Sequence, residues 1–66
     1  MYQLQVENMS CGHCVGSVTK AVQAIDPQAQ VQIDLASKRV TVESPAELGA
    51  IRAAIVEAGF PVTSAQ

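Results

Sequence analysis

The chain of 66 residues has no tryptophan, one tyrosine, one phenylalanine and only four basic residues. Because Tyr2 and Phe60 are its only aromatic residues, a hydrophobic core has to be built from aliphatic side chains. A chain this short forms one domain at most and buries roughly 60% of its unfolded surface, so a large catalytic cleft is not expected. We therefore expect a single domain over residues 1–66 that is not an enzyme.

Positive charge is scarce as well. Six carboxylates outnumber the four Lys and Arg side chains, and the formal net charge is -2. The only adjacent cations are Lys38 and Arg39, so no basic patch is present to neutralise a row of phosphates. This distribution argues against nucleic acid as a partner.

Long apolar runs are also missing. No uninterrupted run approaches the ~18 residues of a membrane-spanning helix, so insertion into a membrane is not expected. Residues 1–5 lack the basic region and apolar stretch of a signal peptide, which predicts a cytoplasmic protein. In a reducing cytoplasm, close cysteines more often bind metals or carry out redox chemistry than form structural disulfides.

The sequence does contain alternating apolar and polar residues, the period of two that predicts half-buried strands. Residues 2–7, 30–35 and 39–43 follow this pattern, and the link Ala36–Lys38 fits a hairpin. A short last strand is predicted over Phe60–Thr63, at a sheet edge because its proline cannot donate to a ladder.

Two other segments follow a helical period. Val15, Val18, Val22 and Ile25 recur at helical spacing, and Pro27 ends that helix.

The second helix has a strong start signal. Ser44 can cap it, Pro45 fits its first position, and Glu47 completes a capping box. Gly59 can end it in a left-handed conformation. The predicted apolar stripe of this helix consists of Leu48, Ile51, Ile55 and Ala58.

Each predicted strand has one polar face, which a parallel sheet covered by helices on both sides would not show. Both helices must therefore cover the same face. Gln3, Gln5, Gln32 and Thr41 are expected on the solvent side. The order strand-helix-strand-strand-helix-strand then predicts an α+β fold, a ferredoxin-like βαββαβ two-layer sandwich with a four-stranded antiparallel sheet.

The segment Met9–Cys14 carries the chemistry, because it holds both cysteines and the only histidine. The predicted elements place Cys11 in the loop after the first strand and Cys14 in the first turn of a helix. Unpaired amide N–H groups there stabilise negative charge, and the thiolate is both the metal-binding and the nucleophilic form of cysteine. Two thiolates suit Cu(I), a soft ion that accepts few donors, whereas structural zinc sites use four ligands.

A dithiol redox protein is the alternative from a different class. Cys-Gly-His-Cys is also the active-site tetrapeptide of protein disulfide isomerases. That likeness covers four residues only. No tryptophan precedes Cys11, and the chain is too short for a thioredoxin fold and has a different strand order.

A wider resemblance covers essentially the whole chain. Met-Ser-Cys-Gly-His-Cys after a first strand resembles the heavy-metal-associated (HMA) domain, whose pattern is Gly-Met-x-Cys-x-x-Cys. Met9, Cys11 and Cys14 match this pattern. Asn8 takes the place of the glycine, and asparagine also tolerates left-handed backbone angles. The Ala-Gly-Phe ending of the second helix, at Phe60, resembles the family as well.

The resemblance implies that Cys11 and Cys14 are the metal ligands. It also implies that Met9 points inward beneath the metal loop and that Phe60 lies beside the site. His13 is a possible additional ligand, although the positions between the cysteines usually face solvent in this family.

The family includes cytoplasmic copper chaperones and metal-binding domains of copper-transporting P-type ATPases. We therefore expect a chaperone that transfers Cu(I) by ligand exchange to such an ATPase or to a copper-responsive regulator. An excised ATPase domain is the alternative within the family. The apo protein is expected to be a monomer, and a copper-bridged homodimer is possible. Related proteins of the family bind mercury or zinc, so the identity of the metal is the least constrained part of this prediction.

Overall fold

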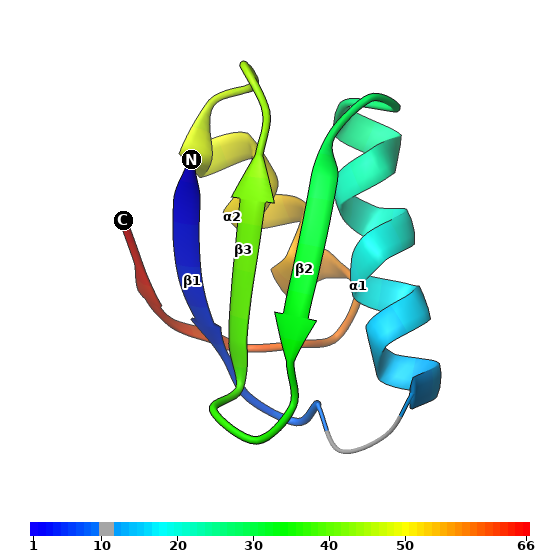
Figure 1. Cartoon of the computed structure of the whole chain (residues 1–66), viewed down its shortest axis with the longest axis vertical. Coiled ribbons are helices and arrows are strands. Elements are labelled where there is room, and N and C mark those ends of the chain that lie inside the picture. Colours follow the sequence, from blue (N-terminus) through cyan, green and yellow to red (C-terminus); the bar gives the residue numbers. More distant parts are fainter. Residues whose placement is uncertain (10–11) are drawn as a thin grey trace.

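A computed structural model describes residues 1–9 and 12–66. The elements in these ranges are β1 (Tyr2–Val6), α1 (Gly12–Ile25), β2 (Gln30–Asp34), β3 (Arg39–Glu43), α2 (Leu48–Glu57) and β4 (Val62–Ala65). The strands form one antiparallel sheet in the order β2-β3-β1-β4, and the helices pack on one face of it (Figure 1). The predicted ferredoxin-like sandwich is confirmed. Within the described ranges, neither helix has the length and apolar character that spanning a membrane requires.

An aliphatic core fills the space between the sheet and the helices. The strands contribute alternate residues, since successive side chains of a strand point to opposite faces. The fully buried side chains are Leu4, Val6, Val18, Val22, Val40, Val42, Ile51 and Ile55. Each contributes roughly 1.5–3 kcal/mol through removal of apolar surface from water. On the open face Gln3 and Gln32 are exposed, as expected.

The helical stripe of α1 is shorter than predicted. Val18 and Val22 are fully buried and Val15 is half-buried, but Ile25 is 44% exposed. Ile25 is the last residue of α1, where the chain already turns away toward β2. The prediction that Ile25 belongs to the buried stripe is therefore wrong.

The bounds of three strands also differ from the prediction. β1 ends at Val6 instead of at residue 7. β2 ends at Asp34, because its side-chain Oδ1 accepts a hydrogen bond from the Ala36 N–H at 3.0 Å and starts a turn. Leu35 lies in that turn and is 37% exposed. At the other end of the chain, β4 runs from Val62 to Ala65 instead of over residues 60–63. β4 is an edge strand, as predicted.

The predicted capping box of α2 is wrong. The helix begins at Leu48, and Glu47 occupies the N-cap position without a side-chain capping bond. Ser44 is engaged elsewhere: its hydroxyl donates to Asp26 Oδ2 at 2.6 Å and accepts from the Ala46 N–H at 3.0 Å. A tertiary partner, which local sequence does not reveal, thus removes the expected cap.

The predicted end of α2 is confirmed. Gly59 has a φ of 101°, in the left-handed region that favours glycine. Its N–H donates to the Val56 carbonyl at 3.0 Å, and the Phe60 N–H donates to the Ile55 carbonyl at 3.3 Å. These two bonds form a Schellman motif, which fixes where Phe60 leaves the helix.

Replacing glycine by alanine is expected to have opposite effects at two positions. Gly59→Ala should lower the free energy of unfolding by about 1–2 kcal/mol, because alanine is strained at positive φ. Gly16→Ala should raise it by about 0.5–1 kcal/mol, because Gly16 lies inside α1. An added Cβ meets nothing within 4 Å at either site, so the backbone alone decides the sign. Urea unfolding of both variants measures the two changes; a loss of stability in both would contradict this account.

Candidate metal site

Three connecting segments meet at one end of the sandwich, where β1 leaves the sheet (Figure 1). The Val6 N–H donates to the Lys38 carbonyl of the β2–β3 turn at 2.9 Å. The Glu7 N–H donates to the Pro61 carbonyl of the α2–β4 link at 2.8 Å. The start of the loop that leads to α1 is therefore held from two sides.

The residues just after β1 have a defined conformation. The Glu7 carboxylate lies 3.3 Å from Lys38 Nζ, an ion pair across the base of the loop. Asn8 follows with a φ of 67°, in the left-handed region. Asparagine adopts this region more readily than most residues, which confirms the expectation that it can replace the glycine at this position.

Cys14 lies in the first turn of α1, as predicted. Its side chain is half-buried and packs against the core, and its Sγ lies 3.7 Å from the Asn8 carbonyl oxygen, to which it donates a hydrogen bond. The thiol is thus turned back toward the loop after β1. The amide groups of the helix start carry partial positive charge, so this place suits a thiolate ligand. The second predicted ligand, Cys11, lies outside the described residues, as does Ser10.

Met9 and Phe60 support this end of the fold from within. Met9 is 3% exposed and belongs to the core cluster, which agrees with its expected inward position. Phe60 is half-buried and packs against the same cluster. Both side chains therefore connect the loop region to the core, one from the loop itself and one from the link after α2.

His13 lies on a different side of α1 from Cys14. It is exposed and lines a shallow hollow of about 270 Å³ together with Gly12, Gly16, Ser17 and Lys20. Successive residues of a helix are about 100° apart around its axis, so the two side chains diverge. Among residues 1–9 and 12–66, no three His, Cys, Asp or Glu side chains come together.

The sequence alone does not indicate that Lys38 and Pro61 contribute to this region. Both act through backbone carbonyls that accept from the segment after β1, and Lys38 adds its ion pair with Glu7. These contacts span more than 30 residues of sequence. No local pattern announces a carbonyl acceptor, so only the folded arrangement reveals them.

The fold and this region define a small α+β domain with a cysteine in the helix turn beside its β1–α1 loop. The model of the heavy-metal-associated domain family matches residues 3–61. The chain belongs to this family.

Several relatives show how far the similarity extends. The chain is 34% identical over 62 residues to the copper chaperone CopZ of Staphylococcus aureus, a match that covers 89% of this chain and 91% of CopZ. A solved structure of the copper chaperone Atx1 from Synechocystis PCC6803 superimposes with a TM-score of 0.87 at 48% identity and covers 91% of this chain and 95% of Atx1.

Copper-transporting ATPase 2 of Rhizobium meliloti is 38% identical over 61 residues. This match covers 88% of the chain and only 7% of the ATPase, so the similarity concerns one small domain of a much longer protein.

Proposed function

We propose that the protein is a copper chaperone that holds Cu(I) between the thiolates of Cys11 and Cys14. It then passes the ion to a partner protein by ligand exchange. The observation that carries this proposal is the position of Cys14, half-buried in the first turn of α1 and turned toward the loop after β1. Cys11 precedes the helix by one residue in the sequence, so the two sulfurs belong to one short segment.

The donors fit a soft ion of low coordination number. Thiolates favour Cu(I), whereas zinc in structural sites takes four nitrogen or sulfur ligands. The Glu7 carboxylate is paired with Lys38, and His13 lies on the outer side of α1. Both observations support a two-sulfur site with His13 as a neighbour rather than a third ligand.

Met9 and Phe60 are the supporting residues in this proposal. The buried Met9 side chain would hold the metal loop against the core, and Phe60 would shield the site from the side of α2. A hydrophobic shell of this kind limits the access of solvent to a metal site, so a substitution that keeps its apolar volume should leave the affinity for Cu(I) nearly unchanged.

Transfer of Cu(I) is possible because an ion with two protein ligands has room for a further ligand. A thiolate of the partner adds to Cu(I) as a third ligand, and one of the two cysteine sulfurs then leaves. The ion stays Cu(I) throughout, and each departing thiolate becomes available for a proton from water. The partner is a metal-binding domain of a copper-transporting P-type ATPase or a copper-responsive regulator. Two copies of the chain joined by copper would use the same chemistry.

The similarity to copper-transporting ATPase 2 favours a second candidate within the family. In that case the domain would be part of a transporter and would receive Cu(I) instead of delivering it. The ligands and the exchange step would be the same, so tests of metal binding apply to both candidates.

An anaerobic titration with Cu(I) and Zn(II) in the presence of competing chelators tests the site. We expect one Cu(I) bound per chain, and no displacement of Cu(I) by excess zinc, with native mass spectrometry reporting the stoichiometry. The expectation follows from the preference of thiolates for soft ions. A preference for zinc over Cu(I) would rule out the proposed site.

The redox alternative makes a different prediction in the same sample. A dithiol oxidoreductase turns over disulfide substrates and needs no tightly bound metal. With excess dithiothreitol supplied to re-reduce the cysteines, we expect the metal-free protein to reduce a model disulfide no faster than dithiothreitol does alone. Multiple turnovers would favour the redox function.

A further inference from the structure

The two edges of the sheet differ in how they are protected. β4 follows Pro61, and its pairing with β1 contains a register shift between Gln5 and Val6. Prolines and irregular pairing of this kind discourage a sheet edge from pairing with another chain. β2, at the opposite edge, has regular pairing with β3 over all five residues and contains neither proline nor a basic residue.

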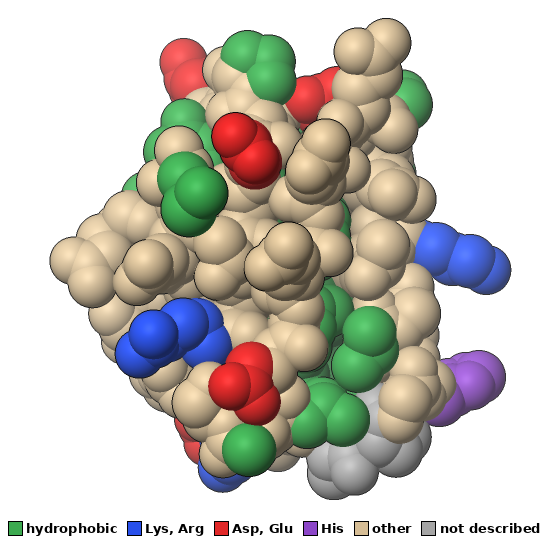
Figure 2. Space-filling model, viewed as in Figure 1, with side chains coloured by type: hydrophobic (Ala, Val, Ile, Leu, Met, Phe, Trp, Pro, Cys, Tyr) green, Lys and Arg blue, Asp and Glu red, His purple; other side chains and the backbone are tan. Residues whose placement is uncertain are grey.

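β2 also presents apolar side chains near its outer edge. Val31 and Ile33 are half-buried although they lie on the helix-covered side, and Leu35 directly after the strand is 37% exposed. Figure 2 shows hydrophobic side chains along the lower part of the junction between β2 and α1. Within the described ranges, the backbone hydrogen bonds of Gln30–Asp34 run to β3, which leaves the outer groups of the strand to solvent.

We propose that this edge pairs with the β2 edge of a second copy of the chain. The two strands would run antiparallel about a two-fold axis at Gln32 and join the sheets into one of eight strands. This arrangement satisfies backbone groups that are otherwise open, as in β-strand addition by peptides. The inference is independent of the proposed metal chemistry.

The strand β2 is complementary to itself in this register. Its odd positions are apolar and its even positions are polar, so Val31 lies opposite Ile33 of the second copy. A slip of the register by one residue would place apolar side chains of one copy opposite polar side chains of the other. The hydrophobic pattern therefore favours the register centred on Gln32.

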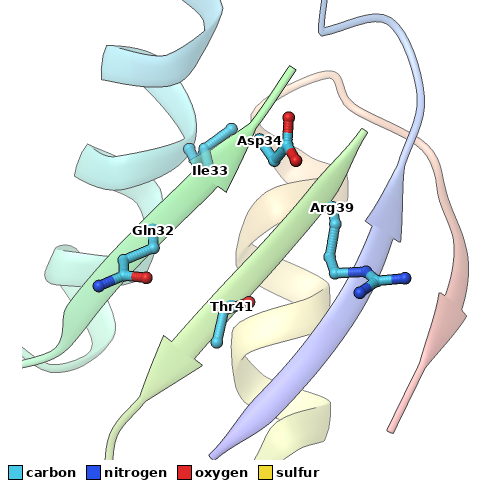
Figure 3. Close-up of a pocket in the computed structure, with 5 residues that line it drawn as sticks. All are labelled: Gln32, Ile33, Asp34, Arg39 and Thr41. Atoms are coloured by element: carbon cyan, nitrogen blue, oxygen red, sulfur yellow. The ribbon is translucent and has the colours of Figure 1, made fainter. Parts of the chain in front are cut away.

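Charge favours the same register. Asp34 is the only charged residue of β2, and it lies opposite Gln30 of the second copy instead of a second carboxylate. Figure 3 shows Gln32, Ile33 and Asp34 in succession along β2, with Thr41 and Arg39 on the neighbouring β3. Arg39, the cross-strand partner of Asp34, adds a cation near each end of the paired strands.

The geometry separates this dimer from one bridged by copper. The β2–β3 turn and the first turn of α1, which holds Cys14, lie at the same end of the molecule, beyond the last residue of β2 (Figure 1). Antiparallel pairing therefore places the two Cys14 residues at opposite ends of the dimer. A single five-residue strand pair is about 17 Å long, so the contact belongs to the weak, transient class. The protein would remain monomeric when dilute.

Sedimentation equilibrium of the metal-free, reduced protein at concentrations up to about 1 mM tests the inference. We expect reversible association of the unaltered chain and chemical-shift changes centred on residues 29–35 as concentration rises. Gln32→Lys places two like charges at the axis and should weaken association roughly fivefold. Gln3→Lys is the matched control, because Gln3 is exposed on the same face but lies in the internal strand β1.

A charge-reversal experiment sharpens the test. Gln32→Glu alone should weaken association as Gln32→Lys does, whereas an equimolar mixture of the two variants should restore it. Three outcomes would overturn the inference: a monomer at the highest concentration, equal effects of the Gln32 and Gln3 variants, or no recovery in the mixture. Loss of association in a Cys11→Ser, Cys14→Ser double variant would also overturn it, since edge pairing does not use the thiols.

Discussion

Cys14→Ser is expected to lower the affinity for Cu(I) by about a thousandfold or more. A serine hydroxyl is a hard, neutral oxygen donor and replaces one of only two soft thiolates. If each thiolate contributes roughly 4 kcal/mol, its loss corresponds to about three decades in the dissociation constant. Anaerobic competition with a chromophoric Cu(I) chelator measures the change. Cys11→Ser should have a similar effect, because the proposal gives both sulfurs the same role.

Two control variants separate ligands from neighbours. His13→Ala should change the affinity less than about threefold, because His13 is exposed on the outer side of α1. Met9→Leu should behave in the same way, because leucine fills a buried methionine site without supplying a sulfur. If either variant bound Cu(I) as weakly as Cys14→Ser, a two-sulfur site would be wrong and that side chain would be a ligand.

The layer structure was predictable because two periods alternate clearly along the chain. Leu4, Val6, Val40 and Val42 occupy alternate positions and are all fully buried. Their polar neighbours lie on the open face, which required both helices to share the other face. A parallel sheet would have needed continuous apolar runs, so the pattern selected a single topology.

The boundaries were less predictable because tertiary partners compete with local signals. Ser44 has the sequence context of an N-cap, yet its hydroxyl bonds to Asp26, 18 residues away. The side chain of Asp34 ends β2 before Leu35 can extend the alternation. Side chains of Ser and Asp compete with regular backbone hydrogen bonding in this way, and sequence alone does not indicate which partner is chosen.

The same distinction applies to the candidate site. The helix position of Cys14 follows from the predicted elements, whereas the inward Met9 and an Asn8 that tolerates left-handed angles follow from the family resemblance. The structure places all three as expected. The contacts that hold the loop base, from Lys38 and Pro61, depend on how distant segments meet. The metal-binding role of Cys11 and Cys14 remains a prediction, to be decided by the affinity measurements above.

The second large effect is expected in the core. Ile51 of α2 is fully buried, with 0% exposure, and packs among aliphatic side chains of the core cluster. Ile51→Ala removes buried methyl groups and leaves a cavity, which should lower the free energy of unfolding by about 2–5 kcal/mol. A chain of this size has a total of only about 3–10 kcal/mol. The variant should therefore melt at least about 10 °C lower than the parent protein, as measured by far-UV circular dichroism of the metal-free protein.

Ile25→Ala is the matched control, because it makes the same substitution at the end of α1, where the side chain is 44% exposed. Its free energy of unfolding should fall by less than about 1 kcal/mol, since little buried surface is lost. Urea unfolding measures the free energy of unfolding of both variants. An m-value equal to that of the parent protein would show that each variant unfolds from the same folded state. Equal losses in the two variants would contradict the assignment of Ile51 to the core. A large loss in Ile51→Ala alone would show that the stability of this small domain depends on its thin aliphatic layer.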